Sequence, residues 1–250
     1  MSASALIGYT GFIGSSFKRD FDYKINSKSV IEDKIDVSEL VICAPSGLKW
    51  KANKQPSEDL LSCKKLYSLI KDKFKNLKRI ILISSNDTLK PTCPYGENRK
   101  VLNDLLEKYC FENKIELFIF YLGMTFGKNA RKGMVYDFLN GNFDYYKGGV
   151  YQLYPVSRIE QDIDYCVKNN IQRALFCSEP IKTSEVKALF GIAENSLSDV
   201  SYKVKPFGIP AIKKSEIFGC INELKKKIIT ITKAKYARYQ FFKCRYLHKF

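Results

Sequence analysis

Three glycines near the start of the chain are spaced three residues apart, after an apolar run and before a segment of helical character. Gly8, Gly11 and Gly14 separate a strand expected at residues 3–7 from a helix expected at about 12–21. Gly8 would allow a tight turn, Gly11 a close approach of the backbone to a pyrophosphate, and Gly14 close packing of helix on strand. The helix N-terminus would offer N–H groups and a positive dipole end to the anion. The motif therefore predicts a dinucleotide-phosphate loop, although three glycines can mark any tight strand-to-helix turn.

Apolar runs alternate with amphipathic segments through the first half of the chain. Continuous apolar strands, rather than alternating ones, are typical of a parallel sheet covered on both faces. We therefore expect an α/β fold with a Rossmann-like, doubly wound parallel sheet, trimmed between its second and third strands, where no helix is evident. The expected strands are 3–7, 23–26, 40–44, 79–83 and 115–122, and the expected helices of this part are 12–21, 57–75 and 95–114.

The pattern becomes less regular after Gly127, which suggests a change of organisation. Helices are expected there at 133–139, 158–169 and 183–190. The resulting division is a nucleotide-binding domain at 1–126, a small C-terminal substrate lobe at 127–219 and a basic helical tail at 220–250.

The net charge of +16 is concentrated toward the C-terminus, where residues 220–250 hold nine Lys or Arg and one acid. A basic body suits anionic small molecules such as nucleotides, and a basic tail suits a larger anionic partner. On a helix, Tyr239, Phe242 and Tyr246 would form one aromatic stripe among the basic residues. Docking on the chain's own domain and contact with an anionic membrane surface both fit this stripe. Nucleic-acid binding is disfavoured because no single-strand-binding motif accompanies the stripe.

Composition excludes several other classes of protein. No apolar run reaches the roughly 18 residues that a membrane-spanning helix needs, and no signal-peptide pattern opens the chain. We therefore expect a cytoplasmic protein, with the tail leaving room for contact with the inner face of the membrane. The eight cysteines form no CxxC pair and His248 is the single histidine, so reduced thiols are expected, with neither a metal site nor histidine-based catalysis.

A second motif accompanies the glycines. Ser84 and Ser85 close the strongest predicted strand, and ten residues after Ser85 a helix begins at Tyr95, with Arg99 one turn further on. Together with the glycine loop and the strand end at residues 42–44, these features resemble the extended or atypical short-chain dehydrogenase/reductase superfamily. That superfamily holds nucleotide-sugar epimerases, dehydratases and ketoreductases.

The resemblance covers about residues 3–190. More narrowly, the segments 49–54, 95–99 and 151–154 resemble bacterial epimerase/dehydratase-like proteins associated with surface-polysaccharide gene sets.

The resemblance implies NAD or NADP as cofactor and a Ser-Tyr-basic catalytic set. Tyr95 would be the general acid/base, Ser85 the hydroxyl that polarises the same substrate oxygen, and Arg99 the cation that favours the phenolate. Arg99 stands where the family has lysine, and Lys100 lies about 100° off that helix face. The cofactor contacts implied by the resemblance are Gly8, Thr10, Gly11, Phe12, Ile13, Gly14, Ser27, Lys28, Ala44, Tyr95 and Arg99.

Departures from the family pattern bear on the cofactor. No acid stands at the end of the second strand to bind a ribose 2′-hydroxyl, and Ser27 and Lys28 could instead hold a 2′-phosphate, which leans toward NADP. A solvated turn is the alternative there. After the fifth strand, Tyr121 and Gly123 replace the family's Arg and Pro.

The implied substrate is a nucleotide-activated sugar. Trp50, Asn53 and Asn98 are candidate substrate ligands, and Asp87 is a weak candidate for a dehydratase acid. The superfamily also implies a homodimer. The competing hypothesis is a catalytically weak or inactive dinucleotide-binding protein whose basic tail docks a membrane or a partner.

Overall fold

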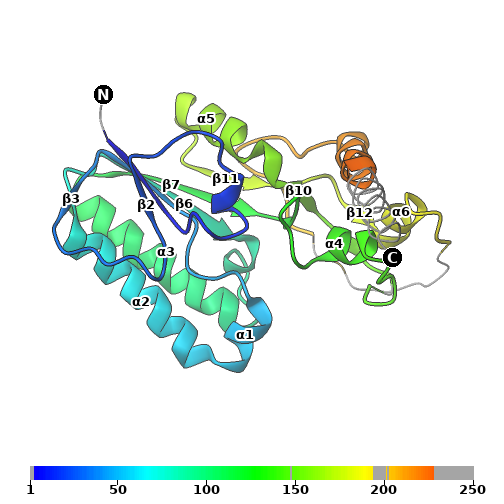
Figure 1. Ribbon diagram of the computed structural model, residues 1–250, viewed down its shortest axis with the longest axis horizontal. Helices are drawn as coiled ribbons and strands as arrows, with labels where there is room; N and C mark the ends of the chain where they lie inside the picture. Colours follow the sequence, from blue (N-terminus) through cyan, green and yellow to red (C-terminus); the bar gives the residue numbers. More distant parts are fainter. Residues whose placement is uncertain (1–2, 147, 194–200, 202, 228–250) are drawn as a thin grey trace, which may run out of the picture.

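The computed structural model describes residues 3–146, 148–193, 201 and 203–227, and it is built on a six-stranded, wholly parallel sheet (Figure 1). The strand order is β11-β7-β6-β4-β1-β2. This confirms the expected α/β, Rossmann-like sheet. The strands are β1 (Ser4–Ile7), β2 (Tyr23–Ile25), β4 (Glu39–Ile42), β6 (Arg79–Ser85), β7 (Glu116–Leu122) and β11 (Arg173–Phe176).

Helices cover both faces of the sheet (Figure 1). Helices α2 (Pro56–Lys73) and α3 (Pro94–Glu112) pack on one face, where their buried residues share a core with Ile7 and Ile42. Helix α5 (Ile159–Lys168) lies on the other face and shares a core with Leu6 and Val41. Neighbouring residues of one strand thus enter opposite cores, which is why these strands are apolar throughout.

The prediction of a helix at residues 12–21 is wrong. Only a three-residue 3-10 turn, Gly14–Ser16, follows the glycine motif, and Phe17 is already extended at φ −67° and ψ 136°. Residues 17–22 must return along the sheet to the start of β2. Because residues 14–16 form a tight turn, only these six residues remain for the return. As a helix they would span about 9 Å, less than the length of β1 at about 13 Å, so they run extended.

Side-chain contacts hold this extended crossover on the sheet where a helix would normally lie. Phe21 is buried and contacts Phe17 edge-to-face at 5.7 Å between ring centroids. The Arg19 guanidinium lies 4.8 Å from the Phe21 ring and donates to Glu39 at 3.0 Å, and the Arg19 backbone N–H donates to Glu160 of α5 at 2.8 Å. The crossover therefore covers the α5 face of the sheet without a helix.

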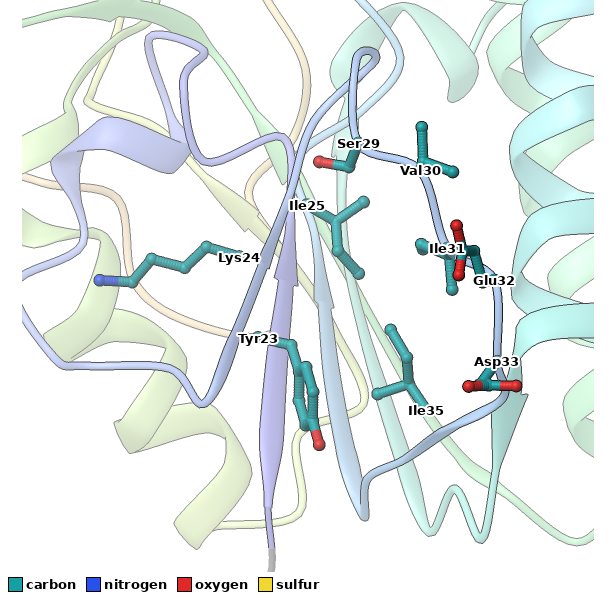
Figure 2. A pocket seen from close by; sticks show the side chains of 9 residues that line it. All are labelled: Tyr23, Lys24, Ile25, Ser29, Val30, Ile31, Glu32, Asp33 and Ile35. Atoms are coloured by element: carbon teal, nitrogen blue, oxygen red, sulfur yellow. The ribbon is translucent and has the colours of Figure 1, made fainter.

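The sheet is trimmed at β2, as expected. The chain runs from β2 to β4 without a helix, through the short strand β3 (Ile35–Asp36), which pairs with β5 (Phe74–Lys75) away from the main sheet. Figure 2 shows the segment that carries Val30, Glu32 and Asp33 running beside β2. A shallow hollow of about 580 Å³ separates the two. The edge of β2 is thus left without a neighbouring strand in the main sheet.

The remaining elements gather beyond the carboxyl ends of the strands (Figure 1). Their core is continuous with the α5 side of the sheet, because Phe138, Leu153 and Val186 belong to the same buried cluster as Leu6. The elements are β8 (Met124–Phe126) paired with β10 (Leu153–Pro155), β9 (Val150–Tyr151) paired with β12 (Ile181–Lys182), α4 (Met134–Leu139), α6 (Thr183–Ala188) and a helix at 214–227.

The expected division at residue 126 does not coincide with the end of the sheet. Helix α5 and strand β11 lie within residues 127–219, yet they complete the doubly wound sheet. Strand β11 and helix α1 (Lys49–Lys54) were not expected from the sequence. Most of the predicted basic tail, residues 228–250 with the stripe Tyr239, Phe242 and Tyr246, lies outside the described residues. No helix within the described ranges is long and apolar enough to cross a lipid bilayer.

The glycine turn gives a direct test of this packing. A Cβ on Gly14 would lie 2.2 Å from the carbonyl oxygen of Gly8, whereas a Cβ on Gly47 would have no atom within 4 Å. We expect Gly14→Ala to lower the free energy of unfolding by about 1–3 kcal/mol, and Gly47→Ala to change it by less than about 0.5 kcal/mol. Urea unfolding of the two variants measures both values, and equal stabilities would contradict the described turn.

Candidate active site

The candidate site lies where β1, β4 and β6 end. Ile7 pairs with Ile42, and Ile42 pairs with Leu82, so the segments that follow these strands leave the same edge of the sheet. Those segments are the glycine turn, the loop that begins at Cys43 and Ala44, and the end of β6 at Ser85. Carboxyl ends of parallel strands are where open α/β sheets bind ligands.

The glycine turn has the compact geometry that the spacing predicts, up to the point where a helix would begin. Gly8 has φ +89°, and its Cβ would lie 2.5 Å from the Cys43 carbonyl oxygen, so this position requires glycine. Gly11 donates to the Gly8 carbonyl at 2.9 Å, and Ser15 donates to the Gly11 carbonyl at 2.8 Å. Thr10 and Gly11 are exposed at this edge.

Side chains of the same turn pack inward. Phe12 lies close to Gly127, at 3.7 Å from the position that a Cβ there would take, and Ile13 packs against the core of the α5 face.

The turn after β2 is built by Asn26. Its side chain accepts from the Lys28 backbone N–H at 2.8 Å and donates to the Tyr9 hydroxyl at 3.2 Å, while its backbone N–H donates to Ser29. Ser27 and Lys28 are exposed on this turn. The structure thus places both candidate cofactor residues at the β2 end of the sheet, beside the glycine turn.

The two members of the candidate acid/base pair lie close together. The Ser85 side chain lies near enough to the Tyr95 phenol to favour the phenolate, and Tyr95 is buried at 9% exposed. Ser85 also accepts from the Asp87 backbone N–H and donates to the Asp87 carboxylate, both at 3.2 Å. Burial raises the pKa of Tyr95, and Arg99 and the Ser85 side chain oppose that shift. Tyr95 is therefore a protonated phenol at neutral pH.

The Arg99 guanidinium is hydrogen-bonded to neighbouring protein groups. Its guanidinium binds both carboxylate oxygens of Asp59 at 2.9 Å, donates to the Ser46 carbonyl at 2.8 Å and contacts the Cys63 sulfur at 3.0 Å. The guanidinium Cζ lies over the Tyr95 ring, 4.6 Å from its centroid. Arg99 thus joins α3, α2 and the loop after β4 behind the phenol.

The three candidate substrate residues are placed differently. Trp50, on α1, is 61% exposed, with the Lys54 ammonium 5.9 Å from its ring. Asn53 accepts from the Tyr95 backbone N–H at 3.0 Å and so caps the first turn of α3. Asn98 is buried and donates to Asp59 and to the Pro56 carbonyl. Trp50 is thus the member of the three with an open surface.

Sequence reasoning missed three contacts at this edge. Asp59 is one acid among several on α2, and nothing in its spacing distinguished it as the partner of Arg99. Lys49 binds the Asp87 carboxylate at 2.7 Å, a contact between α1 and the end of β6. Lys132, from the segment before α4, donates to the Gly47 carbonyl, and burial lowers the pKa of its ammonium. Such long-range pairs carry no local sequence signal.

No protein-family model matches the chain, and no curated protein sequence matches it. Solved structures do resemble it. UDP-N-acetylglucosamine 4-epimerase from Methanobrevibacter ruminantium M1, in complex with UDP-N-acetylmuramic acid, is 13% identical with a TM-score of 0.63, over 92% of this chain and 98% of that one.

Two further structures show the same likeness. RMD from Pseudomonas aeruginosa, complexed with NADPH, is 11% identical with a TM-score of 0.65, over 89% of this chain and 99% of that one. A dTDP-glucose 4,6-dehydratase (DesIV double mutant) from Streptomyces venezuelae, with NAD and DAU bound, is 12% identical with a TM-score of 0.63, over 88% and 95%. The chain has the fold of the nucleotide-sugar epimerases and dehydratases of the short-chain dehydrogenase/reductase type.

The buried Arg99–Asp59 pair predicts a stability effect. Arg99→Met leaves the Asp59 carboxylate, 12% exposed, without its cation, and we expect a loss of about 3–5 kcal/mol in the free energy of unfolding. The double replacement Arg99→Met and Asp59→Asn leaves no unpaired charge and should cost less. Denaturant unfolding gives both values, and a double variant less stable than Arg99→Met would contradict the pairing.

Proposed function

We propose that the chain is a nicotinamide-dinucleotide-dependent enzyme that acts on a nucleotide-activated sugar, with Tyr95 as the proton-transfer group. The observation that carries the proposal is that Ser85 and the buried Tyr95 phenol lie together at the sheet edge that also holds the glycine turn. A hydroxyl and a phenol aimed at one substrate oxygen are the parts that carbonyl–alcohol interconversion needs. The fold supports this reading, because the structures that resemble the chain include such enzymes.

The glycine turn fits a dinucleotide pyrophosphate in its first half. Gly8 and Gly14 pack too closely for any side chain, and exposed Gly11 leaves room for an approaching phosphate. The turn that ends at Ser15 supplies one helical turn of backbone N–H groups. A bound nicotinamide would supply or accept the hydride. Ser27 and Lys28, exposed at the end of β2, favour a 2′-phosphate and hence NADP.

The protonated state of Tyr95 sets its role in the first step. Because burial raises its pKa, the phenol carries a proton at neutral pH and can donate it to an oxygen that gains negative charge as hydride arrives at the adjacent carbon. Ser85 would hold that oxygen. In the reverse direction the phenolate takes the proton back from the alcohol. Epimerisation, dehydration and ketone reduction all begin from this exchange.

Charged and aromatic groups around the pair suit a sugar nucleotide. Trp50 offers an exposed aromatic face, and Lys132 offers an exposed cation that could bind a phosphate. We infer a nucleotide sugar as substrate and a place in surface-polysaccharide biosynthesis. The Rossmann-like sheet and the elements beyond its carboxyl ends would supply the cofactor and sugar sides respectively, and a homodimer is the expected assembly.

A catalytically weak or inactive dinucleotide-binding protein is the second candidate. Two observations favour it: the Arg99 guanidinium is engaged by Asp59, and no α-helix follows the glycine turn. Such a protein would bind the dinucleotide as a structural or sensing ligand and leave the basic tail to dock a membrane or a partner.

Cofactor binding is the first test of the proposal. We expect titration with NADPH or NADH, followed by nicotinamide fluorescence, to give saturable binding that Gly11→Val abolishes, because the valine side chain fills the space of the pyrophosphate. Gly219→Val is the control, since a Cβ at Gly219 meets no atom within 4 Å. Absence of binding to both cofactors would contradict the proposal.

Replacement of the phenol separates the two candidates. We expect Tyr95→Phe to lower kcat by about 10²- to 10⁴-fold while cofactor affinity stays within about twofold, because only proton transfer is lost. The measurement is steady-state turnover with a panel of nucleotide sugars. Turnover at background across the panel, with cofactor binding intact, would support the non-catalytic candidate.

A further inference from the structure

The Asp59–Arg99 contact leaves the guanidinium little freedom. Four of its donor contacts are made to Asp59, Ser46 and Cys63, and its side chain is 6% exposed. A fork-to-fork contact with a carboxylate fixes the plane of the guanidinium as well as its position. The Cζ atom of this fixed guanidinium lies over the Tyr95 ring, 4.6 Å from its centroid.

Asp59 is itself held in place. It lies in the first turn of α2, and its Oδ2 atom also accepts from the Asn98 side chain at 3.0 Å. Asn98 and Arg99 are neighbours on α3, so one carboxylate gathers two consecutive side chains of the helix that carries Tyr95. The carboxylate therefore fixes the start of α3 against α2.

We propose that Asp59 is a positioning residue of the candidate active site, which holds the Arg99 guanidinium over the Tyr95 ring and commits this cation to the phenol instead of to a cofactor ribose. The inference rests on the proposed function for the use made of the phenol. The positioning of Arg99 by Asp59 is inferred only from the contacts among Asp59, Arg99 and Tyr95.

The charges that face Tyr95 come from four elements. Arg99 on α3 favours the phenolate, whereas Asp59 on α2 and Asp87 after β6 oppose it. Lys49 on α1 pairs with Asp87 and moderates that acid. Removal of the Asp59 charge would therefore leave Arg99 with its full effect on Tyr95 and lower the pKa of the phenol.

The experiment is a titration of Tyr95 that needs no substrate or cofactor. Uniform replacement of tyrosine by difluorotyrosine brings phenol titration down to a pH range in which the fold is intact, and ¹⁹F NMR then follows each ring. The Tyr95 signal is the one that Tyr95→Phe removes. We expect Asp59→Asn, which keeps an acceptor for Arg99 but removes the charge, to shift the pKa of this ring downward, and Asp59→Ala, which releases the guanidinium, to give a higher pKa than Asp59→Asn. An unchanged or raised pKa in Asp59→Asn, or equal pKa values in the two variants, would overturn the proposal.

Asp104→Asn is the matched control, because Asp104 lies on the same helix in an exposed pair with Lys100. We expect it to leave the Tyr95 titration where it stands in the wild type. A shift as large as that of Asp59→Asn would overturn the proposal, since the effect would then not depend on contact with Arg99.

A second variant keeps the test decisive if Asp59→Asn does not fold. In Arg99→Met with Asp59→Asn, no unpaired charge is left, and the loss of the cation should shift the Tyr95 pKa upward. A pKa at or below that of the wild type would overturn the proposal. Failure of the proposed function is visible separately, as absent cofactor binding in a protein whose Tyr95 still titrates as expected.

Discussion

The parallel register of β1, β4 and β6 is the constraint on which the candidate site depends. It places the glycine turn, the loop after β4 and Ser85 at one edge of the sheet, although they lie far apart in the sequence. Helix α3 then brings Tyr95 onto Ser85, because Asn53 caps its first turn and Asp59 anchors Arg99 one turn later. The acid/base pair is thus a product of strand pairing and of helix anchoring together.

The part of the sheet around β1 and β2 is built from short connections. The first crossover contains no α-helix, and aromatic packing with the Arg19–Glu39 contact holds it on the sheet. Strand β2 is the edge of the main sheet, and a hollow lies beside it. Both features lie beside the glycine turn, where we propose the dinucleotide binds, whereas Ser85 and Tyr95 lie together as the proposed enzyme requires. The two candidate functions differ in which of these regions is decisive.

The sequence predicted the sheet well because buried parallel strands are apolar throughout, and residues 79–83 and 115–122 are such runs. It failed at residues 12–21, where glycine and phenylalanine spacing suggested a helix but the chain forms only a 3-10 turn at residues 14–16 and then runs extended to β2. In the site, the adjacency of Ser85 and Tyr95 followed from the family resemblance. The partners of Arg99, Asn98 and Lys132 could not be predicted, because they depend on how α2 and distant loops pack.

A crystal structure with the oxidised dinucleotide bound would test the central claim most directly. The account predicts a pyrophosphate against the backbone of residues 8–14 and a nicotinamide ring beside Ser85 and Tyr95, with Arg99 still bound to Asp59. A nicotinamide ring placed away from Tyr95, with the phenol touching protein groups only, would contradict it and leave a protein that binds the dinucleotide without using it for chemistry.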